Sequence, residues 1–197
     1  MTEKQIERIK QKIRKQKAAL SSEKRVYGGI HDGGGRRYYI SDLYMQISDY
    51  KGVITYKKWF DRNFPDDIGS PLLSLYWSIA FFEINKIKEA KIYTIDTAFQ
   101  NIYLHRLLLG QEVKRIDMHE HGYDVLDFAK QLQKESDEVV TKSYLDWLEE
   151  FVETEEYKKW IERFISLNKL LKDEQEVEKR VVLLDHISNL ISENKNR

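Results

Sequence analysis

The sequence predicts an all-α protein, and three observations support this prediction. Only 2 prolines and 9 glycines occur among 197 residues, so long stretches contain no residue that breaks a helix. Apolar residues recur at three- and four-residue steps, for example in segments 87–100 and 175–192, which is the period of an amphipathic helix. Few segments show the strict alternation of a half-buried strand. With 41% hydrophobic residues, the chain can bury a substantial core.

The basic N-terminal helix is expected within residues 1–26, with helical periodicity over 3–20. This segment holds nine Lys or Arg and three Asp or Glu, whereas the whole chain has a net charge of zero. Thr2 and Gln5 have the spacing of a capping box. A narrow stripe of isoleucines and one leucine would dock on the body or on a partner, and whether it docks on its own chain stays open here.

A glycine-rich linker is expected at residues 27–35, where five of nine residues are glycine. Each glycine disfavours a helix by about 1 kcal/mol relative to alanine. An alternative is an anion-binding loop in front of Arg36 and Arg37. The Lys-Ser/Thr pair and the preceding strand of a phosphate-binding loop are both missing, so we favour the linker.

Two helix pairs follow, over 36–50 with 51–63 and over 71–84 with 87–100. The turn at position 49 recurs 37 residues later at position 86, which indicates a repeat. Segment 71–84 is apolar on almost every side, so we expect it to be buried all round at the centre of the fold.

This part of the chain resembles the tetratricopeptide repeat, and more closely a group of uncharacterised bacterial tetratricopeptide-like proteins. A large, a small and an aromatic residue fall at the positions of the repeat pattern in both pairs: Ile40, Ser41 and Tyr44, then Trp77, Ser78 and Phe81. The closer likeness is carried by the segments Asp32–Tyr38, Trp59-Phe60, Phe64–Gly69, Asn101–Leu104 and Leu108–Gly110.

The resemblance covers about residues 32–112 well and 140–165 weakly, and it implies a helical-repeat fold and no particular reaction. Val53 and Lys57 depart from the residue types that are usual at their positions. Two repeats are fewer than the three that an independent solenoid usually needs.

We therefore predict one globular domain in which a repeat pair in 36–112 is closed by C-terminal helices in 113–197. Helices are expected over 124–134, around Tyr144–Phe151, from an N-cap at Thr154 onward, and over 175–192, after an irregular stretch near 111–123.

Composition and motifs favour a protein without cofactor or metal, and without enzymatic activity. The chain has no cysteine, which excludes thiolate nucleophiles and cysteine-ligated zinc. His119, Glu120 and His121, with Asp117 and Asp124 beside them, could supply metal ligands. The two imidazoles could meet one ion, but the sequence fixes no third ligand. A polar loop is favoured because motif matches this short are frequent by chance. We expect no membrane span and no secretory signal, hence a cytoplasmic protein.

The function predicted from these observations is a helical-repeat scaffold that binds a protein or peptide. Its predicted contact surface is the exposed side of the first repeat helix: Arg36, Arg37, Tyr38, Asp42 and Gln46. An alternative is a nucleic-acid-associated protein that acts through the basic segment 4–25. A metal-dependent enzyme that uses segment 117–124 is the third and least favoured hypothesis.

Overall fold

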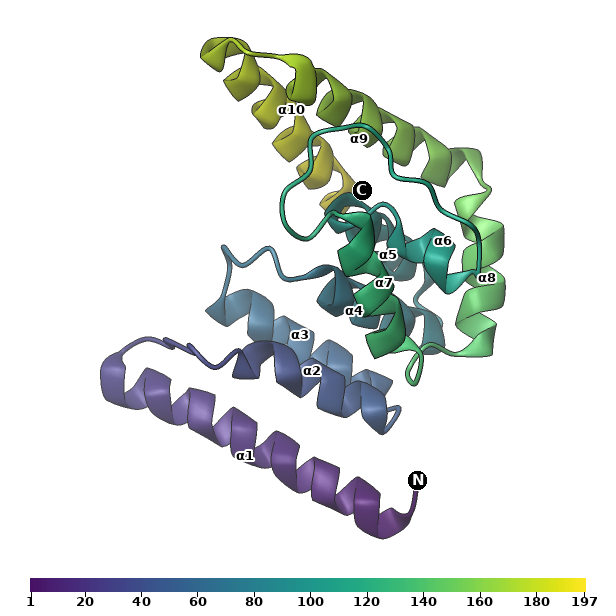
Figure 1. The fold of residues 1–197 in the computed structure, drawn as a ribbon. Helices are drawn as coiled ribbons and strands as arrows, with labels where there is room; N and C mark the ends of the chain where they lie inside the picture. Colours follow the sequence, from purple (N-terminus) through teal and green to yellow (C-terminus); the bar gives the residue numbers. More distant parts are fainter.

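The structure is a computed structural model that describes residues 1–197, and all of its regular elements are α-helices (Figure 1). The all-α prediction is therefore confirmed. The helices are α1 (Glu3–Tyr27), α2 (Arg36–Gln46), α3 (Tyr50–Asn63), α4 (Pro71–Glu83), α5 (Ile87–Gln100), α6 (Leu104–Leu108), α7 (Leu126–Ser136), α8 (Lys142–Val152), α9 (Glu155–Asp173) and α10 (Val177–Lys195). None of them is long and apolar enough to cross a membrane.

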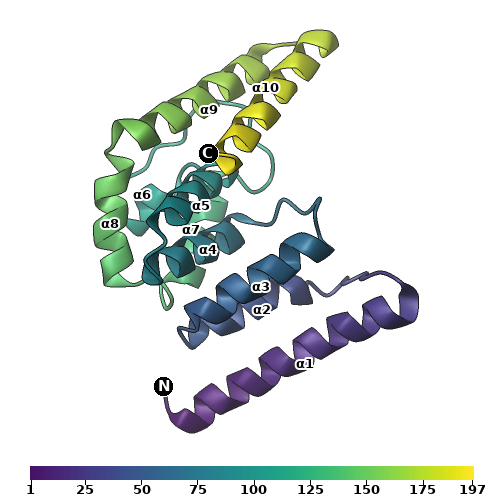
Figure 2. The ribbon, with the colours of Figure 1, turned by 180° about the vertical axis from the view of Figure 1, so that it is seen from behind.

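The helices stack in an array that follows the chain. Helix α1 packs on α2, the α2–α3 pair packs on α4, α4 packs on α5, and α5 carries α9 and α10. Figures 1 and 2 show α1 at one end of the array and the α9–α10 hairpin at the other. Helices α7 and α8 contact α4. Each helix thus buries its apolar face against its neighbours in the array.

Helix α4 is the centre of the core, as its apolar sequence predicts. Every residue from Leu73 to Phe81 is buried. The Ser78 hydroxyl lies 2.6 Å from the Thr94 hydroxyl and 2.9 Å from the Tyr144 hydroxyl. These groups satisfy one another in the dry interior, where an unpaired hydroxyl would be costly. The cluster also ties α4 to α5 and α8.

Helix α1 docks on its own chain, which the sequence leaves open. Ile13 and Leu20 are buried in the core, and the predicted capping box at Thr2 is present. The helix continues to Tyr27, further than the predicted 3–20, and ends where Gly28 takes a φ of 72°. Glycine adopts this left-handed conformation with little steric strain, and helices therefore commonly end at such a residue.

The C-terminal half contains one element that the sequence did not predict, the short helix α6. The stretch before α7 is irregular, as expected, and passes along α9, where the His119 amide donates to the Asn168 carbonyl over 3.0 Å. Met118 in this stretch is buried. The predicted N-cap is confirmed, because the Thr154 hydroxyl accepts from the Tyr157 amide over 3.3 Å.

Candidate functional site

The candidate site is a groove of about 380 Å³ between α2, α4 and α7. It is lined by Tyr38, Tyr39, Asp42, Ser70, Leu72, Leu73, Tyr76 and Glu135. Three tyrosines and two leucines give it apolar walls, while the two carboxylates are the only charged groups in the lining. Pockets that bind ligands commonly combine apolar walls with a few polar groups in this way.

The helical period explains why these side chains meet. Ile40 and Leu43 of α2 are buried in the core, which leaves Tyr39 and Asp42 on the other side of the helix. On α4, Ser70 caps the first turn by accepting from the Leu73 amide over 3.3 Å. The side chains that follow this cap are thereby held at the mouth of the groove.

Asp42 is the polar centre of the groove. Its Oδ1 accepts from the Tyr76 hydroxyl over 3.2 Å, and its Oδ2 accepts from Gln46 Nε2 over 2.8 Å. Burial raises the pKa of Asp42, the two hydrogen bonds lower it, and the nearby carboxylates of Glu135 and Glu138 raise it further, so that the pKa lies above its usual value. No Lys or Arg of the chain lies within ion-pair distance of Asp42 to offset this. A cationic group that entered the groove would find acceptors but no competing cation.

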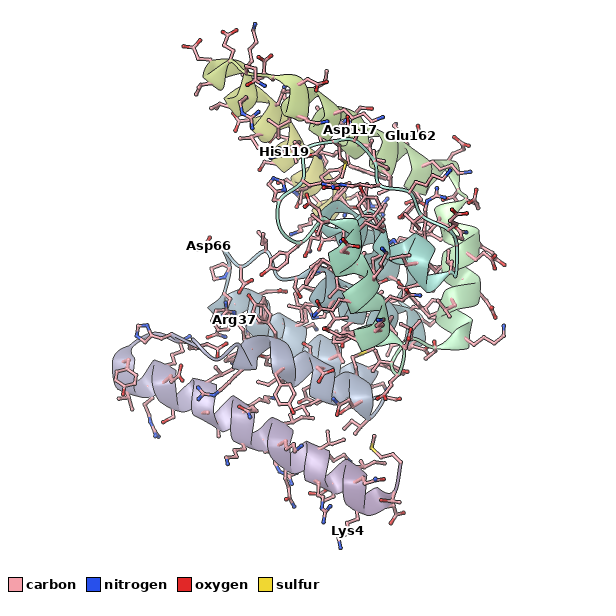
Figure 3. The ribbon with its side chains drawn as sticks, viewed as in Figure 1. Lys4, Arg37, Asp66, Asp117, His119 and Glu162 are labelled. Carbon is pink, nitrogen blue, oxygen red and sulfur yellow. The ribbon has the colours of Figure 1, made fainter.

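Arg37 and Tyr38 take part in a separate network that fixes the loop before α4. Arg37 is labelled in Figure 3. Its Nε donates to Asp67 Oδ2 over 2.7 Å, and its NH1 group lies 3.2 Å from Asp32. The Tyr38 hydroxyl donates to Asp67 over 2.8 Å. Burial raises the pKa of Asp67, but hydrogen bonds from Tyr38, the Gly69 amide and Arg37 outweigh it, so the pKa is lowered.

The five residues of the predicted contact surface are therefore divided between two surroundings. Tyr38, Asp42 and Gln46 lie at or beside the groove. Arg37 is held by carboxylates of its own chain, and Arg36 pairs with Glu23 of α1 over 2.6 Å. The two arginines thus fix α1 and the loops around α2, and their proposed role toward a partner stays a prediction.

Several residues of the groove carry no signal in the sequence that marks them as part of a site. Tyr39 and Leu72 read as ordinary members of apolar stripes, and Tyr76 reads as one more residue of the buried helix. The one available signal was the hydroxyl of Tyr76 in an otherwise apolar helix. A buried tyrosine usually has a polar partner, so this hydroxyl indicates a polar group nearby. Glu135 lies on α7, and no sequence signal places that helix beside α2.

The candidate metal ligands of segment 117–124 are not gathered into a group of three or more. The rings of His119 and His121 lie 4.8 Å apart, but His121 Nδ1 is engaged with Asp124 over 3.0 Å. Asp117 pairs with Lys172. No group of three or more His, Cys, Asp or Glu side chains in the chain could hold a metal ion.

No family model, curated protein or solved structure matches the chain. The function of the chain is therefore inferred from the geometry and chemistry of its own residues.

Proposed function

We propose that this protein is a helical-repeat scaffold of the tetratricopeptide type that binds a peptide segment of a partner protein in the α2–α4–α7 groove. Two features support the repeat type. Helices α2–α3 and α4–α5 form successive packed pairs, and the small residues Ser41 and Ser78 are fully buried where the repeat pattern expects close helix approach. Stacked helical pairs commonly present such grooves to peptides.

The single observation that carries the proposal is the uncompensated Asp42 carboxylate inside a tyrosine-lined groove. Tyrosine side chains offer large contact area with few rotatable bonds. A carboxylate without a cationic partner favours a ligand that brings one, by charge-assisted hydrogen bonds. The proposed ligand is therefore an extended peptide in which an Arg or Lys reaches Asp42 and a neighbouring apolar residue contacts Tyr39 and Leu72.

The test is a selection of displayed random peptides of about 12 residues on the immobilised full chain. Peptides that contain Arg or Lys beside an apolar residue should be enriched. A synthetic copy of an enriched peptide should bind the Asp42→Asn variant about tenfold more weakly than the wild type. The reason is that one charge-assisted hydrogen bond contributes on the order of 1.4 kcal/mol or more. The asparagine oxygen can still accept from Tyr76, so the fold should be retained.

The matched control is Asp185→Asn, which removes the same charge from an exposed position of α10. It should bind the selected peptide like the wild type. Equal affinity of the peptide for the Asp42→Asn and wild-type chains would show that the groove is not the site. A selection that enriches nothing above an unrelated helical protein would count against the scaffold proposal itself.

A further inference from the structure

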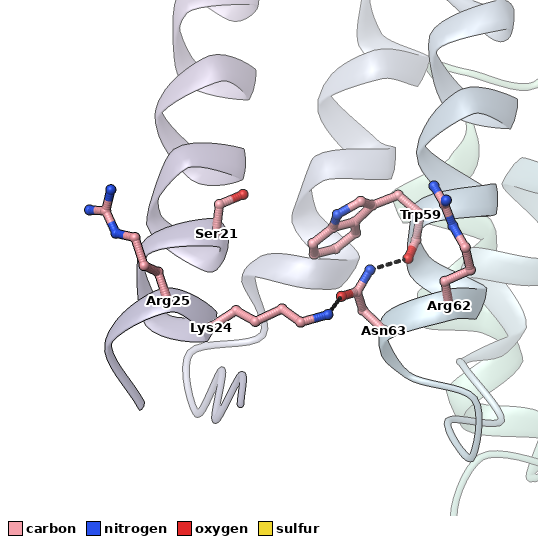
Figure 4. A pocket seen from close by; sticks show the side chains of 6 residues that line it. All are labelled: Ser21, Lys24, Arg25, Trp59, Arg62 and Asn63. Carbon is pink, nitrogen blue, oxygen red and sulfur yellow. Dashed lines mark hydrogen bonds between the residues drawn. The ribbon is translucent and has the colours of Figure 1, made fainter. Parts of the chain in front are cut away.

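A second cleft, of about 500 Å³, lies between the C-terminal ends of α1 and α3 (Figure 4). It is lined by Ser21, Lys24, Arg25, Trp59, Arg62 and Asn63. This cleft shares no residue with the groove between α2, α4 and α7. Three of its six lining residues are cationic and none is acidic.

No carboxylate of the chain forms an ion pair with the three cations of this cleft. Lys24 Nζ donates to the side-chain oxygen of Asn63 over 2.7 Å (Figure 4). Arg62 Nε donates to the Lys58 carbonyl over 3.1 Å. Neither Lys24, Arg25 nor Arg62 belongs to any ion pair of the structure. Both guanidinium groups therefore keep terminal N–H donors for an anion.

The negative C-terminal ends of the two helices offset only part of the positive charge in the cleft. Lys24 and Arg25 lie in the last turn of α1, and Arg62 lies in the last turn of α3. Each helix C-terminus carries roughly half of a negative charge. Two ends therefore offset about one of the three cations, and a net positive charge remains at the mouth of the cleft.

An aromatic surface lies among these cations. The Trp59 indole stacks on Tyr56 with ring centroids 5.4 Å apart and an interplanar angle of 20°, which fixes its orientation. Figure 4 shows the indole between α1 and α3, with Lys24 and Arg62 on either side of it, whereas Arg25 extends from the outer side of α1. An aromatic ring in a basic cleft is the arrangement on which a nucleobase stacks while its phosphates contact Lys and Arg.

The positive charge continues beyond the cleft along both helices. Lys17 precedes Lys24 by seven residues on α1, and Lys58 precedes Arg62 by four residues on α3. These spacings place each pair on one helical face. The stretch of α1 from Lys17 to Lys24 covers about 10 Å, so the cleft is one end of a longer basic track.

We propose that the α1–α3 cleft binds single-stranded nucleic acid, with a base stacked on Trp59 and phosphates held by Lys24, Arg25 and Arg62. Planar guanidinium groups suit phosphate because they donate two parallel hydrogen bonds. Trp59 favours a strand with open bases over a duplex, whose bases are already stacked. This activity goes beyond the proposed peptide binding and uses a different surface.

The test measures the affinity of the full chain for labelled single strands of about 12 nucleotides by fluorescence anisotropy. Three phosphate contacts predict a log–log salt slope of about −2, so affinity should fall about 20-fold between 50 and 200 mM salt. The variant with Arg25→Glu and Arg62→Glu should bind at least tenfold more weakly. Trp59→Leu should lose about fivefold or more.

The matched control carries Lys134→Glu and Lys159→Glu, two exposed lysines outside the cleft with the same total charge change. Binding by this control should stay within about threefold of the wild type. Arg25 and Arg62 are also exposed, so their variants should fold, and circular dichroism checks this.

Three results would overturn the proposal. The first is no binding at about 50 mM salt. The second is an equal loss in the control variant, which would mean that only total charge matters. The third is an acidic peptide that competes as strongly as the oligonucleotide, which would assign the cleft to an acidic protein partner instead.

Discussion

A drop in pH should destabilise this protein through His105, a buried imidazole in α6. Its side chain is almost fully buried, its Nδ1 lies 2.9 Å from the Tyr157 hydroxyl, and its Nε2 has no hydrogen-bond partner. Burial lowers the pKa of His105 from 6.5 to about 3. The folded protein therefore keeps this imidazole neutral at a pH where the unfolded chain would protonate it.

The size of the effect follows from proton linkage. Between pH 6.5 and about 3 the unfolded state binds one proton more than the folded state at this group, so the free energy of unfolding falls as the pH falls. One pH unit in this window corresponds to about 1.4 kcal/mol. Acidification from neutral pH to about 4.5 should thus remove about 3 kcal/mol, a large share of the stability of a typical domain.

The assay is urea unfolding, followed by circular dichroism, of the wild type and a variant with His105→Leu and Tyr157→Phe. Replacing both partners by apolar residues leaves no unpaired group and should be nearly neutral at pH 7. Other titrating groups act equally in both proteins, so the difference between their free energies isolates His105. A difference that stays constant between pH 7 and about 4.5 would refute the buried neutral imidazole.

Three further substitutions test the packing that positions the two sites. Gly52→Ala should destabilise by about 1–3 kcal/mol, measured by thermal unfolding, because its Cβ would lie 2.5 Å from Tyr44 ring atoms. Tyr144→Phe should cost about 1 kcal/mol in urea unfolding, since it removes the 2.9 Å bond to Ser78. Ser70→Ala should cost about 1 kcal/mol in the same measurement by removing the cap of α4; no change would mean that the loop before α4 holds the helix start without it.

The sequence predicts the helices well where local chemistry decides them. The cap at Thr154 and the all-round apolar segment 71–84 are local signals, and both describe the structure correctly. Helix α6 has only five residues, which is too short for a periodic pattern to stand out. The end of α1 was placed too early because its last turns are mostly exposed and polar.

The groove was only partly predictable, for a physical reason. Tyr38 and Asp42 lie on one helix, so their spacing alone places them near each other. Tyr76 and Glu135 join them from helices 34 and 93 residues beyond Asp42, and only tertiary packing brings them together. The same applies to Arg36 and Arg37, whose carboxylate partners Glu23 and Asp67 come from other segments.

The distribution of charge connects the two proposed sites. Residues 1–26 carry the positive excess that the rest of the chain balances. Because α1 docks beside α2 and α3, this excess is concentrated at one end of the array (Figure 1), and the basic cleft there shares no lining residue with the acidic groove. A folded chain with a net charge of zero can therefore present one surface that attracts polyanions and another that attracts cations. A net charge of zero would by itself argue against a nucleic-acid-binding protein, whereas the local charge of the cleft argues for one.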